Sequence, residues 1–179
     1  GFGMRNETII PTILGWTGDP EEIRRLDRRK EILYREIIDE KGLAPLAGVE
    51  VFLREIHGAE VPCAVASSTS RLNITFALEC MGMSHEFDAL VAGEDVENGK
   101  PDPEVFLAAA EKLGAEPENC VVFEDAHVGI EAGLAAGMKV IAVSTTHPAE
   151  TLQDAHLVVE SMDELSTGKI TEILAPCSG

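Results

Sequence analysis

From residue 46 onward, short apolar runs alternate with stretches of helical periodicity, and this alternation limits the possible folds more than any other feature of the chain. The helical stretches are about 70–81, 103–113 and 127–136, and the apolar runs are 61–66, 89–92, 121–123, 140–143 and 157–159. Strands that are apolar throughout are buried on both faces, which is typical of parallel sheets covered by helices. The sequence therefore predicts an α/β fold with a Rossmann-like, doubly wound parallel sheet.

The N-terminal part of the chain has helical patterns and no strand pattern. Residues 4–14 have a helical pattern that Pro11 would weaken or kink. Asp19 is followed by a proline and, three residues after the cap, by a glutamate, which together predict the start of a second helix. We therefore expect a helical domain in residues 1–45 and an α/β domain in residues 46–179.

The charge of the chain is acidic and unevenly distributed. The formal net charge is −18. Residues 1–45 carry 8 basic and 9 acidic side chains, whereas residues 46–179 carry 6 and 23. This shift supports a domain boundary near Pro45. An acidic body argues against nucleic acid as a partner, because binding of the phosphate backbone depends on Lys and Arg.

Apolar runs and cysteines bear on the compartment. No apolar run approaches the ~18 residues of a membrane-spanning helix, so we expect no membrane partner. The four cysteines are far apart in the sequence and form no CxxC motif, and we expect reduced thiols at Cys63, Cys80, Cys120 and Cys177. A reducing compartment such as the cytoplasm follows from this expectation.

Two adjacent carboxylates, Glu124 and Asp125, follow the apolar run 121–123 and precede a helix rich in small residues. Ligands of parallel α/β sheets bind at the carboxyl ends of the strands. Neighbouring carboxylates repel each other unless a cation joins them, and Mg²⁺ favours oxygen ligands together with water and phosphate. The pair therefore indicates metal-assisted phosphate chemistry. The alternative is a solvated strand end at which Asp125 caps the helix.

Two more polar motifs follow predicted strands. Ser67 and Ser68 lie at a strand-to-helix turn, where hydroxyl and backbone N–H groups can form a phosphate cradle. An ordinary Ser/Thr helix cap is the alternative. Pro101 and Pro103 stiffen the backbone after Lys100, and an ammonium group held in this way is suited to bind phosphate. The alternative for Lys100 is a solvent-exposed surface lysine.

Taken in order, Ser67, Lys100 and the pair Glu124 and Asp125 resemble the haloacid dehalogenase superfamily of phosphohydrolases. Within it, the chain is similar to the β-phosphoglucomutase-like (CbbY-like) branch with a helical cap, over nearly its whole length. The resemblance implies that Ser67 and Lys100 bind the transferring phosphoryl group. It implies that Asp125, with Glu124, ligates Mg²⁺. It also implies that residues 1–45 are part of an all-helical cap.

The chain departs from this family at one motif. The first strand of the family ends in Asp-x-Asp-Gly, whose first aspartate attacks phosphorus and whose second acts as general acid and base. The chain has no such motif, and the nearest acidic residues, Glu7 and Asp19, lie in helical contexts. In the family this strand lies between the strands before Ser67 and Glu124. We therefore expect a core that lacks its first, central strand, in a sequence that is incomplete at its N-terminus by that strand and part of the cap.

The resemblance implies a Mg²⁺-dependent phosphatase that acts on a small phosphorylated metabolite through an aspartyl-phosphate, with a nucleophile outside the given chain. A phosphomutase and a non-catalytic protein of the same fold are the alternatives, so the sequence leaves open whether the chain is an enzyme. Arg5 matches a cap arginine that binds the distal phosphate in the mutase, which makes it a substrate-binding candidate; an exposed helix arginine is the alternative. Residues 3–7 and 16–22 also resemble plant plastid relatives of riboflavin-pathway phosphatases, so the plastid stroma is an alternative compartment.

Overall fold

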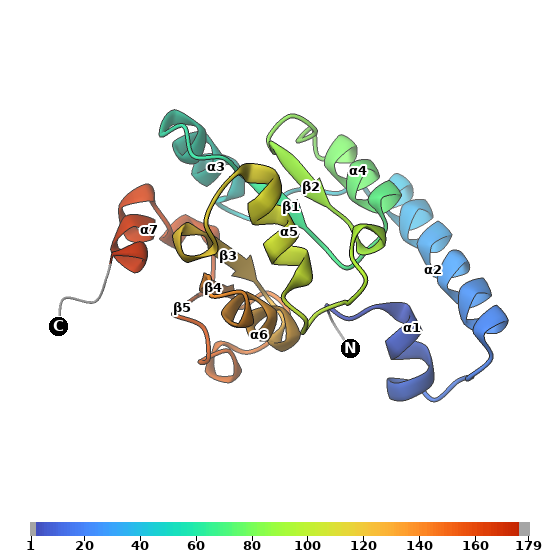
Figure 1. Cartoon of the computed structure of the whole chain (residues 1–179). Helices are drawn as coiled ribbons and strands as arrows, with labels where there is room; N and C mark the ends of the chain where they lie inside the picture. Colours follow the sequence, from blue (N-terminus) through green and yellow to red (C-terminus); the bar gives the residue numbers. More distant parts are fainter. Residues whose placement is uncertain (1–2, 176–179) are drawn as a thin grey trace.

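Five parallel strands form the centre of the molecule (Figure 1). The structure, a computed structural model, describes residues 3–175. The strands are β1 (Ala64–Ala66), β2 (Ala89–Val91), β3 (Val121–Glu124), β4 (Lys139–Val143) and β5 (Leu157–Val159). β1 pairs with β2 in one sheet, and β3, β4 and β5 form a second sheet in that order. The predicted α/β class with parallel strands is confirmed.

Helices cover both faces of the larger sheet. Successive residues of β4 point to opposite faces, so Val140 and Ala142 join one buried cluster, and Ile141 and Val143 join another. Two helices contribute to the first cluster: α5 (Glu104–Leu113) and α6 (His127–Ala135). Two others pack in the second: α3 (Val49–Gly58) and α7 (Thr167–Leu174). The doubly wound arrangement is therefore confirmed.

Two N-terminal helices, α1 (Asn6–Thr8) and α2 (Pro20–Lys41), lie along one side of the core (Figure 1). α2 packs against the core helix α4 (Arg71–Cys80). A π-helical turn, Ile9–Ile13, continues α1, and the N–H of Leu14 donates to the carbonyl of Ile9 at 2.9 Å. Pro11 has no N–H to donate, and the helix is irregular at this point, as expected from the proline.

Three details of the core differ from the sequence prediction. Helices α3 and α7 were not predicted, although Phe52, Leu53 and Ile56 of α3 are buried at helical spacing. The first strand is shorter than the predicted 61–66. Pro62 cannot donate to a strand ladder, and the N–H of Cys63 donates to the Asp88 carboxylate at 2.8 Å instead.

An apolar slot separates the two sheets. It has a volume of about 490 Å³ and lies between β1 and β3, with α3 and α5 along its sides. Phe123 of β3 lines the slot and keeps 37% of its surface exposed, and the residues of β1 are only partly buried. A parallel sheet in an α/β fold is normally buried throughout. Here, by contrast, the facing edges of β1 and β3 have no strand partner within residues 3–175, which explains their exposure.

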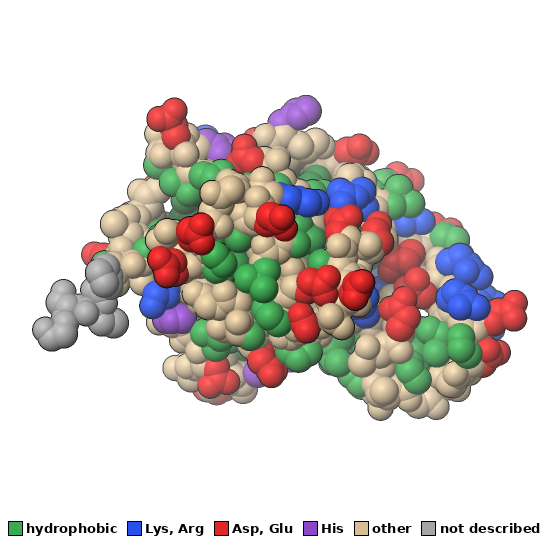
Figure 2. Space-filling view, in the orientation of Figure 1, with side chains coloured by type: hydrophobic (Ala, Val, Ile, Leu, Met, Phe, Trp, Pro, Cys, Tyr) green, Lys and Arg blue, Asp and Glu red, His purple; other side chains and the backbone are tan. Residues whose placement is uncertain are grey.

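Acidic side chains cover much of the surface of the core. Figure 2 shows Asp and Glu across the visible face of the core and a group of Lys and Arg side chains over α2. Among residues 3–175, no helix is long and apolar enough to cross a membrane.

Cys63, Cys80 and Cys120 are free thiols, as expected. Burial raises the pKa of the Cys63 thiol to about 11, and the nearby Asp88 carboxylate adds to this effect. Cys177 lies outside the described residues.

Candidate active site

A cleft of about 810 Å³ lies at the carboxyl ends of the strands, between the core and the α1–α2 side of the molecule. All six residues singled out from the sequence line it: Arg5, Ser67, Ser68, Lys100, Glu124 and Asp125. The strands within each sheet are parallel, and the last residues of β1, β3 and β4 (Ala66, Glu124 and Val143) line the cleft, which explains this convergence. The cleft is therefore the candidate active site.

The Ser67 loop follows β1 directly. The N–H of Ser67 donates to the carbonyl of Val91 at 3.0 Å, and its hydroxyl oxygen accepts from the N–H of Thr69 at 3.2 Å. Since that hydroxyl accepts from the backbone, its own hydrogen is available to donate into the cleft. Gly93 packs on the loop so closely that a Cβ there would lie 2.5 Å from the Ser68 carbonyl oxygen. The loop is thus held from two sides.

Lys100 is a buried lysine at the floor of the cleft. Only 7% of its surface is exposed. Its ammonium forms a short ion pair with Glu124, donates to the carbonyl of Ala66 at 3.4 Å and lies 4.6 Å from the centre of the Phe106 ring. The Lys100–Pro101 peptide bond is cis. This environment differs from that of a solvent-exposed surface lysine, and it places the charge beside the Ser67 loop.

Glu124 is also buried, and its carboxylate is fully engaged. One oxygen pairs with Lys100, and the other accepts from the N–H groups of Asp125 and Ala126 at 3.1 and 3.3 Å. Gly129, one turn into α6, lets the carboxylate approach the helix, because a Cβ at this position would overlap the carboxyl group. The metal-binding role predicted for Glu124 stays a prediction, and the contacts in the structure are those that orient Lys100.

Asp125 lies half-buried in the wall of the cleft. Its Oδ2 accepts a short hydrogen bond from the Thr146 hydroxyl, and the Thr145 hydroxyl lies 3.5 Å away. Both threonines follow β4, and sequence analysis missed them. The rule that drew attention to Ser67 and Glu124 applies equally to hydroxyl residues directly after this strand.

Arg5 lines the cleft, but its guanidinium is committed to the backbone of the loop that follows β2. It donates to the carbonyls of Gly93, Val96 and Glu97 at 2.7, 2.7 and 2.9 Å. Its Nε is buried with no hydrogen-bond partner among the described residues. Arg5 is therefore half-buried and anchored rather than exposed, and its predicted role in substrate binding stays a prediction.

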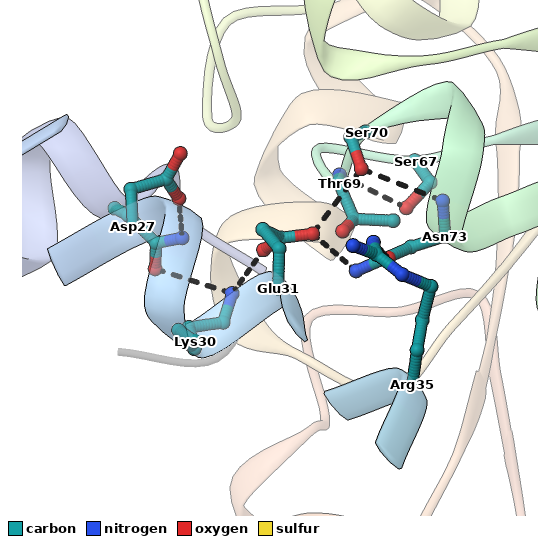
Figure 3. A network of polar contacts seen from close by, with 9 residues as sticks. Asp27, Lys30, Glu31, Arg35, Ser67, Thr69, Ser70 and Asn73 are labelled. Carbon is teal, nitrogen blue, oxygen red and sulfur yellow. Dashed lines mark hydrogen bonds and ion pairs between the residues drawn. The ribbon is translucent and has the colours of Figure 1, made fainter. Parts of the chain in front are cut away.

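Helix α2 supplies the opposite wall of the cleft with Asp27, Lys30 and Glu31. Figure 3 shows Glu31 directed toward the N-terminal end of α4, whereas Asp27 and Lys30 hydrogen-bond to the Asn6 side chain of α1. The Lys30 side chain is 56% exposed to solvent and also lines the cleft.

The residues present fit a Mg²⁺ site only in part. Asp125 offers a carboxylate to the cleft, whereas Glu124 is occupied by Lys100 and by backbone N–H groups. Within residues 3–175, no three His, Cys, Asp or Glu side chains converge as a metal-binding group would. Most of the oxygen ligands that Mg²⁺ requires would have to come from elsewhere.

A model of the haloacid dehalogenase-like hydrolases matches residues 8–143. The chain belongs to this family. It is 38% identical over 165 residues to the chloroplastic 5-amino-6-(5-phospho-D-ribitylamino)uracil phosphatase of Arabidopsis thaliana. This match covers 92% of this chain and 44% of that protein. The chain is 33% identical over 132 residues to validoxylamine A 7'-phosphate phosphatase of Streptomyces hygroscopicus subsp. limoneus. This match covers 74% of this chain and 62% of that protein.

A solved structure of β-phosphoglucomutase from Clostridium difficile has the same fold. The TM-score is 0.86 at 29% sequence identity, and the match covers 96% of this chain and 78% of that chain. This haloacid dehalogenase-like chain is therefore similar to the β-phosphoglucomutase-like branch. It spans 44% and 62% of the lengths of the two curated relatives.

Proposed function

We propose that this chain forms the phosphate-binding part of a phosphatase that acts on a small phosphorylated metabolite. The observation that carries the proposal is Lys100, a buried ammonium held beside the Ser67 loop by Glu124 and Phe106. Serine hydroxyl, backbone N–H groups and one fixed cation are the donors that a phosphoryl group requires. Both relatives named above are phosphatases of phosphorylated small molecules, which supports the same class of substrate here.

The residues of this chain would bind and orient the ester. Ser67 would donate its free hydroxyl hydrogen to a phosphoryl oxygen, and Lys100 would pair with another. Glu124 keeps Lys100 in place through their ion pair. Because that pair is neutral overall, another cation must balance a phosphate dianion in this acidic cleft. This requirement supports Mg²⁺ as cofactor, with Asp125 as the ligand that the chain itself supplies.

We further propose that a β-strand fills the slot between β1 and β3 and supplies the nucleophile. The slot adjoins the cleft, since Ala66 and Phe123 line both. A strand parallel to β1 would satisfy both edges and would end beside Lys100. Its aspartate would attack phosphorus as the ester P–O bond breaks, and water would then cleave the acyl phosphate. Slow amide exchange in β1 and β3 of the natural protein that contains this chain would support this assignment, and fast exchange there would contradict it.

A phosphomutase is less well supported by the geometry. Its substrate carries a second phosphate at some stage, and the far side of the cleft would then need a free cation. Arg5 is bound to three carbonyls, and Lys30 pairs with Glu31 at 2.9 Å. Carboxylates of Asp27 and Glu31 share this wall. We therefore propose a substrate whose leaving group carries no second phosphate. For the protein itself we propose the cytoplasm or the plastid stroma.

The test is phosphate release from a panel of sugar and polyol phosphates by the natural protein that contains these residues, with and without Mg²⁺. We expect Mg²⁺-dependent turnover that Ser67→Ala lowers by about 100-fold, as for loss of one donor to a transition-state oxygen. Lys41→Ala, which removes an exposed lysine at the end of α2 and outside the cleft, is the control and should leave turnover unchanged. A correctly folded protein without turnover on the whole panel would favour the non-catalytic alternative.

A further inference from the structure

Helix α2 is joined to the Ser67 loop through one carboxylate, that of Glu31. Its Oε2 accepts from the Ser70 hydroxyl at 3.1 Å and, in a short hydrogen bond, from the Asn73 side-chain amide. Its Oε1 accepts from Lys30 at 2.9 Å. Figure 3 shows Glu31 reaching from α2 to the first turn of α4. Only 14% of the Glu31 side chain is exposed, so these hydrogen bonds are largely shielded from water.

Asn73 depends on α2 for both ends of its side-chain amide. The NH₂ group donates to Glu31, and the carbonyl oxygen accepts from Arg35, one helical turn further along α2. The residue is 3% exposed. A buried amide must keep its hydrogen bonds or become solvated. Movement of α2 away from the core would therefore leave Asn73 without partners until water reached it.

Ser70 connects this contact to the phosphate loop. It is the N-cap of α4, and its hydroxyl oxygen accepts weakly from the N–H of Asn73 at 3.4 Å while the hydroxyl donates to Glu31. Ser70 lies three residues after Ser67, and the intervening Thr69 donates its N–H to the Ser67 hydroxyl. The conformation of the cradle and the position of α2 are thus linked through consecutive hydrogen bonds of one short segment.

We infer that Glu31 is a positioning residue that couples the docking of α2 to phosphate binding at the Ser67 loop. The inference rests on the proposed function only for the identity of the ligand. Coupling of this kind is reciprocal: phosphate that orders the loop stabilises the docked helix, and a docked helix raises phosphate affinity. Substrate entry and closure of the cleft would then be linked by a contact outside the reacting atoms.

The test compares amide exchange and inorganic phosphate binding, in the presence of Mg²⁺, in the natural protein that contains these residues and in three variants. Glu31→Ala should speed exchange in α2 and in residues 67–74 together and weaken phosphate binding by at least about fivefold. Glu31→Gln keeps an acceptor for Ser70 and Asn73 and should restore most of both properties. Glu36→Ala makes the same change of charge on the exposed side of α2 and should behave as the wild type.

Faster exchange in α2 alone, with residues 67–74 and phosphate affinity unchanged, would overturn the inference, because Glu31 would then serve only helix packing. A wild-type chain that does not bind phosphate would contradict the proposed function instead. In that case the exchange of residues 67–74 in Glu31→Ala still decides whether Glu31 positions the loop.

Discussion

At the scale of single residues, the buried pair of Lys100 and Glu124 organises the candidate site. Removing one member of such a pair leaves an unpaired buried charge, which commonly costs about 3–5 kcal/mol. Here Glu124 also accepts two backbone N–H groups at the start of α6, so the lysine is held by an acceptor that is itself fixed. The pair therefore positions a charge at the cleft with little freedom to move.

Gly129 makes this arrangement possible, and its substitution is the first prediction. A methyl group at residue 129 would overlap the Glu124 carboxyl group. We expect Gly129→Ala to lower the free energy of unfolding by about 1–3 kcal/mol through overpacking, measured by urea denaturation.

The matched control is Gly58→Ala at the end of α3, where the added methyl group meets open space. This variant should be neutral or slightly stabilising, because alanine is the better helix former. A Gly129→Ala protein as stable as Gly58→Ala would show that the Glu124 carboxylate is not confined as described.

At the scale of elements, the loop between β2 and α5 is fastened by two carboxylates. Backbone N–H groups of Glu97 and Asn98, at 2.7 and 2.8 Å, hold the pKa of Glu104 below its usual value. The N–H of Ala92 and the Arg71 side chain do the same for the pKa of Asp95. Both carboxylates therefore stabilise the loop as anions.

Acid should loosen this loop, which carries Lys100 at its end. Because the folded-state pKa values are lowered, the stabilisation is complete above the ordinary values of about 4 and is lost as the pH falls through the lower folded values. We expect amide exchange of residues 92–98, corrected for its intrinsic pH dependence, to rise below about pH 4.

Glu104→Gln should remove part of that acid dependence, whereas Glu111→Gln, on the exposed side of the same helix, should retain it. A loop whose protection stays constant down to pH 2 would contradict the assignment of the two carboxylates as its fasteners.

The elements also show what the sequence could and could not predict. Strands β2 to β5 and helices α4 to α6 followed from apolar runs and helical periodicity, since each buries a face. Helix α3 was missed although Phe52, Leu53 and Ile56 have helical spacing, because its start at Gly48 has no side-chain cap. Ser67, Lys100 and the Glu124–Asp125 pair were predictable from their places after strands, whereas Arg5 was suggested only by the family resemblance. The role of Glu31 was not, because it depends on how α2 packs against α4.

At the scale of the whole molecule, two partial sheets share one cleft and one apolar slot. The cleft collects polar groups from the ends of the strands, and the slot separates β1 from β3 beneath it. The N-terminal helices are joined to this frame where Glu31 of α2 accepts a hydrogen bond from Asn73 of α4. The proposed phosphate-binding cleft, the Glu31 contact and the slot for the proposed strand therefore lie in one continuous region of the molecule.

The central claim, that the Ser67 loop and Lys100 bind phosphate, is tested most directly by a titration of the natural protein that contains these residues with inorganic phosphate in the presence of Mg²⁺, followed by amide NMR shifts. We predict saturable shifts at Ser67, Ser68 and Gly93, abolished in Ser67→Ala. Shifts confined to the arginines of α2, or no saturable shift at all, would contradict the claim.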